Sequence, residues 1–232
     1  MKNPWLVIGG IAVVLIGGSI AYAQWTASSA NDGVEVATNV KGNPDADVVL
    51  VKYSDFECGA CAQAAPFVRE IVEMYSDDLR FEYKHFPVIN RTPQAARAAE
   101  AAGQQGKFFE FHDALFDNFP EWTQSGNPNA LFTRYAEQLD LDMGQWRTHQ
   151  RASLLRNKIA DEFAEGRALG VTGTPTFFLN GERLNISTYN DILVAVEEAL
   201  GVDSAGGATP EAIELDLGEM QTSEDGVIEL EI

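Results

Sequence analysis

The chain has 232 residues, 45% of them apolar, and a formal net charge of −19 at pH 7. This length and composition allow one globular domain with appendages. The excess of acidic residues argues against nucleic acid as a partner, because phosphate binding depends on Lys and Arg. The charge is uneven, since residues 184–232 contain 12 acidic side chains and neither Lys nor Arg. We interpret this end of the chain as solvated and acidic.

The N-terminal segment is apolar and has no charged residue between positions 5 and 23. Lys2 precedes it and the next basic residue is Lys41, so the positive-inside rule places the N-terminus in the cytoplasm and the rest of the chain outside. The stretch is about long enough to span a bilayer, which takes roughly 20 residues. We expect residues 1–25 to be a transmembrane anchor. A cleaved signal peptide is the alternative, because residues 21–23 fit the small-x-small cleavage pattern.

A tether and a first β–α unit are predicted next. Residues 26–40 are small and polar, as in a tether, and residues 42–45 predict a turn. Val48 to Tyr53 is a short, mostly β-branched apolar run, which predicts a buried strand. Apolar residues then recur at helical spacing, which predicts a helix that begins near Cys58.

The only two cysteines, Cys58 and Cys61, lie in the first turn of this predicted helix. Unpaired backbone N–H groups and the positive end of the helix dipole favour a thiolate there. In such settings a cysteine pKa falls from about 8.5 to roughly 3.5–7.5. Cys61 lies one turn further on the same face and can attack a mixed disulfide formed at Cys58. We therefore predict a redox-active dithiol with Cys58 as the exposed nucleophile and Cys61 as the buried resolving thiol.

Three other uses of the pair were weighed. A zinc site would need two more ligands, and the only histidines, His85, His112 and His149, are widely separated. A purely structural disulfide would close a very short loop and stabilise weakly. A metallochaperone could bind soft Cu(I) with the two thiolates, and the lack of nearby Met or His ligands counts against it.

The middle of the chain is predicted to be helical. Leu79 to Phe86 alternates as a strand does. Thr92-Pro93 and Asn127-Pro128 are helix starts, and Gly170 ends the last helix of the region. The predicted helices cover residues 92–105, 107–119, 127–139 and 142–169. Phenylalanines cluster on the second of these, where we expect a hydrophobic core rather than a cofactor pocket, because no polar group converges on it.

Strand character returns from Val171 to Leu179, and Asn180-Gly181 is a strong hairpin turn. A last strand is predicted over residues 183–186, followed by a helix over residues 188–200 that Gly201 ends. Beyond it, residues 213–217 and 227–232 alternate like strands, and the sequence leaves open whether they pair.

Three separated motifs resemble the DsbA-like branch of the thioredoxin superfamily, whose members are extracytoplasmic thiol–disulfide oxidoreductases. They are Tyr-Ser-Asp-Phe-Glu-Cys-Gly-Ala-Cys at residues 53–61, Lys-His-Phe-Pro at 84–87 and Gly-Thr-Pro-Thr-Phe-Phe-Leu-Asn-Gly at 173–181. The resemblance covers about residues 40–200 in the family's order. It implies an α/β thioredoxin fold with an inserted α-helical domain. It also implies a cis Pro175 beside the dithiol, with Thr174 and Pro175 lining the groove that holds an extended substrate peptide.

This resemblance divides the chain. A first thioredoxin-like part covers residues 41–90, a helical insert 91–169 and a second thioredoxin-like part 170–202, with an acidic tail over 203–232.

Two departures from the family concern redox tuning. Gly59 and Ala60 stand between the cysteines, where the family often has Pro and an aromatic residue or His. Lys52 stands six positions before Cys58, where the family commonly has an acid that assists proton transfer at the second sulfur. A lysine there could stabilise a thiolate by its charge or extend out to solvent.

Together with the predicted anchor, the resemblance implies a membrane-tethered enzyme that acts on exported cysteine-containing proteins and needs no cofactor beyond its disulfide. An oxidase would be re-oxidised by a quinone-linked membrane partner, whereas a reductase or isomerase would receive electrons from a membrane donor. We expect an oxidase of moderate strength, between thioredoxin at about −270 mV and DsbA at about −120 mV.

Overall fold

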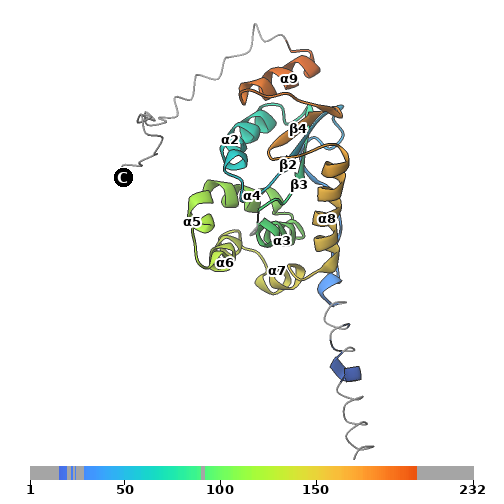
Figure 1. The fold of residues 1–232 in the computed structure, drawn as a ribbon, viewed down its shortest axis with the longest axis vertical. Helices are drawn as coiled ribbons and strands as arrows, with labels where there is room; N and C mark the ends of the chain where they lie inside the picture. Colours follow the sequence, from blue (N-terminus) through green and yellow to red (C-terminus); the bar gives the residue numbers. More distant parts are fainter. Residues whose placement is uncertain (1–15, 20–21, 23, 25–28, 90–91, 203–232) are drawn as a thin grey trace, which may run out of the picture.

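A computed structural model describes residues 16–19, 22, 24, 29–89 and 92–202 (Figure 1). The acidic tail expected over residues 203–232, with its two alternating segments, and most of the expected anchor lie outside the described residues. No helix within the described ranges has both the length and the hydropathy needed to cross a membrane.

In the described part, five strands form one mixed sheet in the order β1-β3-β2-β4-β5. The parallel pair β2 (Val48–Ser54) and β3 (Leu79–His85) lies at its centre, and both segments were predicted to be strands. Strand β1 (Asn39–Gly42) pairs antiparallel with β3, and β4 (Thr176–Leu179) pairs antiparallel with β2. Strand β5 (Glu182–Arg183) forms the other edge. This is a thioredoxin-like α/β fold.

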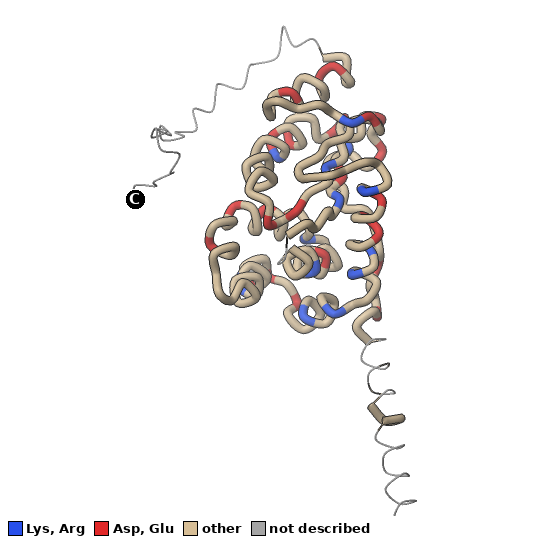
Figure 2. The backbone as a smooth tube through the Cα atoms, viewed as in Figure 1, with Lys and Arg blue, Asp and Glu red and all other residues tan. Residues whose placement is uncertain are grey.

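Helices cover both faces of the sheet (Figure 1). The core on one face combines α2 (Gly59–Met74), α4 (Phe108–Asp117) and α9 (Asn190–Leu200) with inward residues of β2 and β3. The other face is covered by α8 (Ser153–Ala168), where Phe86, Tyr53 and Phe178 form a smaller buried cluster. Helix α9 carries three acidic residues and neither Lys nor Arg (Figure 2).

The region between β3 and β4 is helical, as expected. Its helices are α3 (Thr92–Gly103), α4, α5 (Phe119–Thr123), α6 (Pro128–Gln138), α7 (Met143–His149) and α8. The short α5 was not predicted. The phenylalanine cluster belongs to the main hydrophobic core, with Phe108, Phe111 and Phe116 buried, which confirms the prediction of a core.

The prediction of one helix over residues 142–169 is wrong, because the chain breaks between α7 and α8. Ala152 is extended at the break, with ψ 128°, and is fully buried. On one side of it the Trp146 indole donates to the Ala98 carbonyl oxygen of α3 at 3.0 Å. On the other side α8 packs along β3. The break allows α7 to pack on α3 while α8 packs along β3.

The predicted strand over residues 171–179 is too long, since β4 begins only at Thr176. Pro175 has no N–H to donate to a strand ladder, so pairing starts after it. The hairpin at Asn180-Gly181 is confirmed, with φ of 50° and 84°. Strand β5 occupies Glu182–Arg183 rather than 183–186, and Gly201, with φ 69°, ends α9 as predicted.

Residues expected to form a tether contact the domain from position 30 onward. Ala30 is buried, and the Asn31 amide donates to the Ser153 hydroxyl at 2.9 Å. Glu35 and Gln104 exchange two hydrogen bonds of 2.8 and 2.9 Å. Positions 39 and 40 belong to β1. The stretch from 30 to 40 therefore lies on the helical insert and the sheet edge.

Candidate active site

The loop that follows β2 is held by the buried carboxylate of Asp55. Its oxygens accept backbone N–H groups from Glu57 at 2.7 Å, Val88 at 2.7 Å and Ile89 at 3.0 Å, and the hydroxyl of Thr92. This carboxylate ties the approach to the dithiol to the loop that leads into the helical insert. The role of Asp55 was not predicted, although an acid directly after an apolar strand is a signal for it.

Cys58 is the N-cap residue of α2, as the helical pattern predicted, and its side chain is partly exposed. A hydrogen bond from the Cys61 thiol lowers the pKa of Cys58 to about 5, against the opposing effect of partial burial. The Thr174 side chain and the backbone N–H groups of Ala60 and Cys61 act in the same direction. Cys58 is therefore a thiolate at neutral pH.

Cys61 has the opposite environment. It is fully buried one turn into α2. Burial raises the pKa of the Cys61 thiol, and its hydrogen bond to Cys58 raises it further, while the charge of Lys52 acts in the other direction. The two sulfurs thus differ as an attacking and a resolving thiol must.

The fold brings Thr174 and Pro175 to the dithiol across 116 residues of sequence. The Thr174–Pro175 peptide bond is cis, as the resemblance implied. The Cys58 sulfur lies 3.3 Å from the Thr174 carbonyl oxygen, to which the protonated thiol can donate. These predicted substrate-binding residues therefore lie directly beside the Cys58 sulfur.

A groove of about 650 Å³ adjoins Pro175. Its walls come from Phe67 on α2 and from residues 186–190, and the Phe67 and Tyr189 rings lie 5.2 Å apart. The Tyr189 hydroxyl donates to the Ala60 carbonyl oxygen at 3.2 Å, which joins the groove to the dithiol loop. The sequence did not indicate these aromatic residues, because nothing local relates Phe67 to Tyr189.

The residues between the cysteines face solvent. Gly59 and Ala60 are exposed, and a Cβ built on Gly59 would have no neighbour within 4 Å. Stabilisation of the thiolate comes from Cys61, Thr174 and the backbone instead.

Lys52 lies inside the protein and does not extend to solvent, which excludes that alternative. Its side chain is fully buried, and its Nζ donates to the Cys61 carbonyl oxygen at 3.4 Å and lies 5.1 Å from the centre of the Phe116 ring. Burial lowers the pKa of Lys52, while the charges of Cys61, Cys58 and Asp113 oppose this. Lys52, which stands where the family commonly has an acid, therefore contacts the backbone of the dithiol helix.

Two of the histidines considered as zinc ligands are engaged with carboxylates. His85 Nε2 lies 2.8 Å from Glu100, and His112 Nδ1 lies 2.8 Å from Asp113. Across the described residues, no group of three or more His, Cys, Asp or Glu side chains is arranged to hold a metal ion.

Residues 35–198 match the model of a family described as thioredoxin. The chain belongs to the thioredoxin family. A solved thioredoxin-like oxidoreductase from Silicibacter pomeroyi DSS-3 is 30% identical, with a TM-score of 0.61, and the match covers 71% of this chain and 92% of that one. Wolbachia pipientis α-DsbA1 is 19% identical with a TM-score of 0.64, covering 75% and 96% of the two chains. The latter likeness shows the fold, and together these matches confirm the resemblance to DsbA-like proteins.

Curated relatives are longer proteins. The chain is 36% identical over 180 residues to a protein named Na(+)/H(+) antiporter NhaA 3 from Salinispora tropica, a match that covers 75% of this chain and 27% of that protein. The chain thus spans about a quarter of the length of the curated relatives that it matches.

Proposed function

We propose that this protein catalyses thiol–disulfide exchange outside the cytoplasm and forms disulfides in exported proteins that contain cysteine. The observation that supports the proposal is that Cys58 and Cys61, one helical turn apart, have opposite environments. Cys58 is partly exposed with a pKa lowered to about 5, whereas Cys61 is buried with a raised pKa. Thr174 and the cis Pro175 lie beside the exposed sulfur.

The reaction proceeds in two exchanges. A substrate thiolate attacks Cys58 of the oxidised dithiol, the Cys58–Cys61 bond breaks, and the Cys61 sulfur leaves with the electron pair and takes up a proton. A second substrate thiolate then attacks the substrate sulfur of the mixed disulfide, and Cys58 leaves as a thiolate. The substrate is oxidised by two electrons, and the dithiol is reduced by two. The disulfide is the only redox group that this scheme requires.

The low pKa of Cys58 favours this direction. A stabilised thiolate lowers the free energy of the reduced dithiol and so makes the disulfide more oxidising. The substrate would lie extended along Thr174 and Pro175, with an apolar side chain in the groove beside Phe67 and Tyr189. Both features suit an enzyme that binds unfolded segments briefly and releases them oxidised.

The proposed location rests on the N-terminal sequence. An uncharged apolar stretch after Lys2 supports a membrane anchor or a signal segment, with the dithiol outside the cytoplasm. The antiporter names of the curated relatives support a membrane setting for this type of domain. A quinone-linked membrane oxidase would then regenerate the disulfide. A membrane electron donor would take its place if the protein acted as a reductase or isomerase.

The test is the equilibrium between the purified protein and glutathione. We expect a potential between about −270 mV and about −120 mV, with catalysed oxidation of a reduced, unfolded substrate. The Cys58→Ser variant should have no activity, and Cys61→Ser should accumulate a mixed disulfide at Cys58. A potential at or below the thioredoxin value would overturn the oxidase proposal and favour a reductase.

A further inference from the structure

We infer that Lys52 is the internal proton donor for the leaving Cys61 sulfur, and that it regains its proton through a small cavity that ends at Asp113. This inference rests on the proposed thiol–disulfide exchange. It assigns the proton that the exchange requires at the buried sulfur to a particular side chain and route.

The position of Lys52 on the sheet isolates its charge from solvent. Lys52 pairs with Tyr83 on β3 and Phe177 on β4, both fully buried. Its Nζ reaches the Cys61 carbonyl oxygen and the Phe116 ring. In the part of the chain that the structure describes, no carboxylate forms an ion pair with it. An ammonium group held in this way costs several kcal/mol to bury, so it readily gives up a proton to a nearby base.

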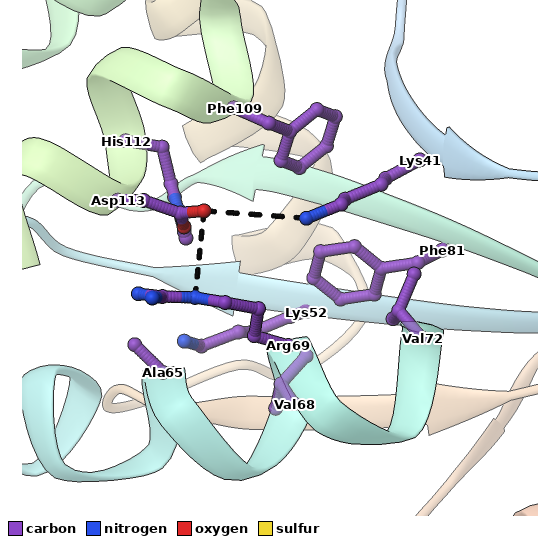
Figure 3. A pocket seen from close by; sticks show the side chains of 10 residues that line it. All are labelled: Lys41, Lys52, Ala65, Val68, Arg69, Val72, Phe81, Phe109, His112 and Asp113. Carbon is purple, nitrogen blue, oxygen red and sulfur yellow. Dashed lines mark hydrogen bonds and ion pairs between the residues drawn. The ribbon is translucent and has the colours of Figure 1, made fainter. Parts of the chain in front are cut away.

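A cavity of about 10 Å³, about the room that one water molecule needs, adjoins Lys52. Figure 3 shows Lys52 beside Arg69 of α2, with Asp113 of α4 and Lys41 of β1 across the pocket. The Asp113 carboxylate lies 3.4 Å from Arg69 Nε and 4.0 Å from Lys41 Nζ, and its side chain is 22% exposed. The pocket therefore leads from a buried ammonium to a carboxylate that reaches solvent.

The chemistry at Cys61 calls for such a donor. When the disulfide is attacked at Cys58, Cys61 departs as a buried thiolate whose environment favours the neutral thiol. A proton moves from Lys52 Nζ to Cys61 Sγ, which leaves a neutral amine and a neutral thiol. A water molecule in the cavity then returns a proton to Lys52. The negative charge of Asp113 stabilises the proton as it passes along this path. In the reverse direction the neutral amine takes the proton from Cys61.

The charges around Lys52 determine the pH at which it donates. The groups that face it are Cys58 at the N-cap of α2, Cys61 and Arg69 of α2, His112 and Asp113 of α4, Lys41 of β1 and Tyr83 of β3. Burial lowers the pKa of His112 to about 4, so this imidazole is neutral above that pH. Among the residues that line this pocket, Asp113 is therefore the anion, and Lys41, Lys52 and Arg69 are the cations. Removing its charge should make Lys52 a stronger acid.

The test measures how fast excess reduced glutathione cleaves the disulfide of the full chain between pH 5.5 and pH 9, with each rate divided by the glutathione thiolate concentration. For the wild type, this corrected rate should fall as Lys52 loses its proton. Lys52→Met should be slower by on the order of 10²-fold, as expected for the loss of a general acid, and its corrected rate should not change with pH. Lys52→Arg keeps the charge but cannot donate at these pH values, so it should be slow as well.

Two further variants separate proton transfer from structural damage. Asp113→Asn removes the charge at the partly exposed end of the cavity, where Asp113 also contacts Arg69 and His112, and should move the inflection to lower pH. Lys84→Met removes a lysine from the other face of the sheet, where Lys84 pairs with Glu165 at 3.3 Å, and should leave the profile unchanged. The inference is overturned if Lys52→Met follows the wild-type profile, or if Asp113→Asn leaves the inflection in place. A wild-type disulfide that glutathione does not cleave would instead contradict the proposed function itself.

Discussion

Two lysines are buried among the residues that the structure describes, and their surroundings are opposite. Lys158 of α8 forms ion pairs with Glu100 and, at 3.3 Å, with Glu162. Glu100 also accepts from the Asn39 amide at 2.7 Å and lies 2.8 Å from His85. Lys52 of β2 has a carbonyl oxygen and an aromatic ring for neighbours.

The charge of Lys158 stabilises the structure, whereas the charge of Lys52 is available for proton transfer. The Lys158 cluster joins α3, α8, β3 and β1. Burial opposes the ionisation of Glu100, but the hydrogen bond from His85 and the charge of Lys158 lower the pKa of Glu100 to about 2. Such a carboxylate does not change its charge in the physiological range. Among the described residues the Lys52 ammonium has no carboxylate partner, and it contacts the Cys61 carbonyl oxygen, so its charge can change during the reaction.

The largest effect is expected from Lys158→Met, which leaves two buried carboxylates without their cation. The free energy of unfolding should fall by about 3–5 kcal/mol, measured by urea denaturation. The rate of disulfide exchange per folded molecule should stay the same, because the cluster does not contact the dithiol. Lys107→Met is the matched control, since Lys107 and Glu110 form an exposed pair worth at most about 1 kcal/mol. A loss below that value for Lys158→Met would remove the distinction between the two lysines.

Gly166→Ala tests how tightly α8, the helix that carries Lys158, packs against the sheet. A Cβ at this position of α8 would lie 2.8 Å from Phe86 and 2.9 Å from Tyr53. Overpacking of this kind costs about 1–3 kcal/mol, which a shift in the urea midpoint would report. Gly126→Ala, where a Cβ would meet nothing within 4 Å, should have little effect. Equal effects of the two substitutions would mean that α8 shifts to make room for the added methyl group at little cost in stability.

The reduced dithiol should couple stability to pH. The pKa of Cys58 is about 5 in the folded state and 9.0 in its ordinary state, so the folded protein favours the thiolate. This stabilisation is complete above pH 9, declines as the pH falls, and is lost below about pH 5. The free energy of unfolding of the reduced wild type, minus that of Cys58→Ser, should therefore grow from pH 5 to pH 9. Cys58 is half-exposed and screened by solvent, so we expect growth on the order of 1 kcal/mol. A pH-independent difference would contradict the lowered pKa.

Local sequence patterns were enough to predict the central strands, the start of α2, the partial exposure of Cys58 and the burial of Cys61. Each depends on contacts within a few residues, such as the β-branched run over residues 48–53 and the helix terminus at Cys58. The cis Pro175 beside Cys58 came from the family resemblance, since no local pattern places residue 175 next to residue 58.

Features that depend on distant packing were missed. The break at Ala152 follows from what α7 and α8 each contact, and the helical periodicity through residues 142–169 gave no sign of it. The position of β1 depends on its pairing with β3. The sequence allows Lys52 to be buried or exposed, because only the packing of α4 over the sheet determines its position.

The smallest effect on stability is expected from Lys52→Met, and this result completes the comparison with Lys158→Met. Removing an unpaired buried charge leaves no stranded partner, so the free energy of unfolding should change by less than about 1 kcal/mol or increase. The positive charge stabilises the thiolate of the reduced form, so its loss should make the disulfide less oxidising. We expect the equilibrium constant with glutathione to fall by up to about tenfold, equivalent to about 30 mV for this two-electron couple. If Lys52→Met instead destabilised the protein as strongly as Lys158→Met, Lys52 would be a structural charge. If the potential were unchanged, its charge would not reach the dithiol.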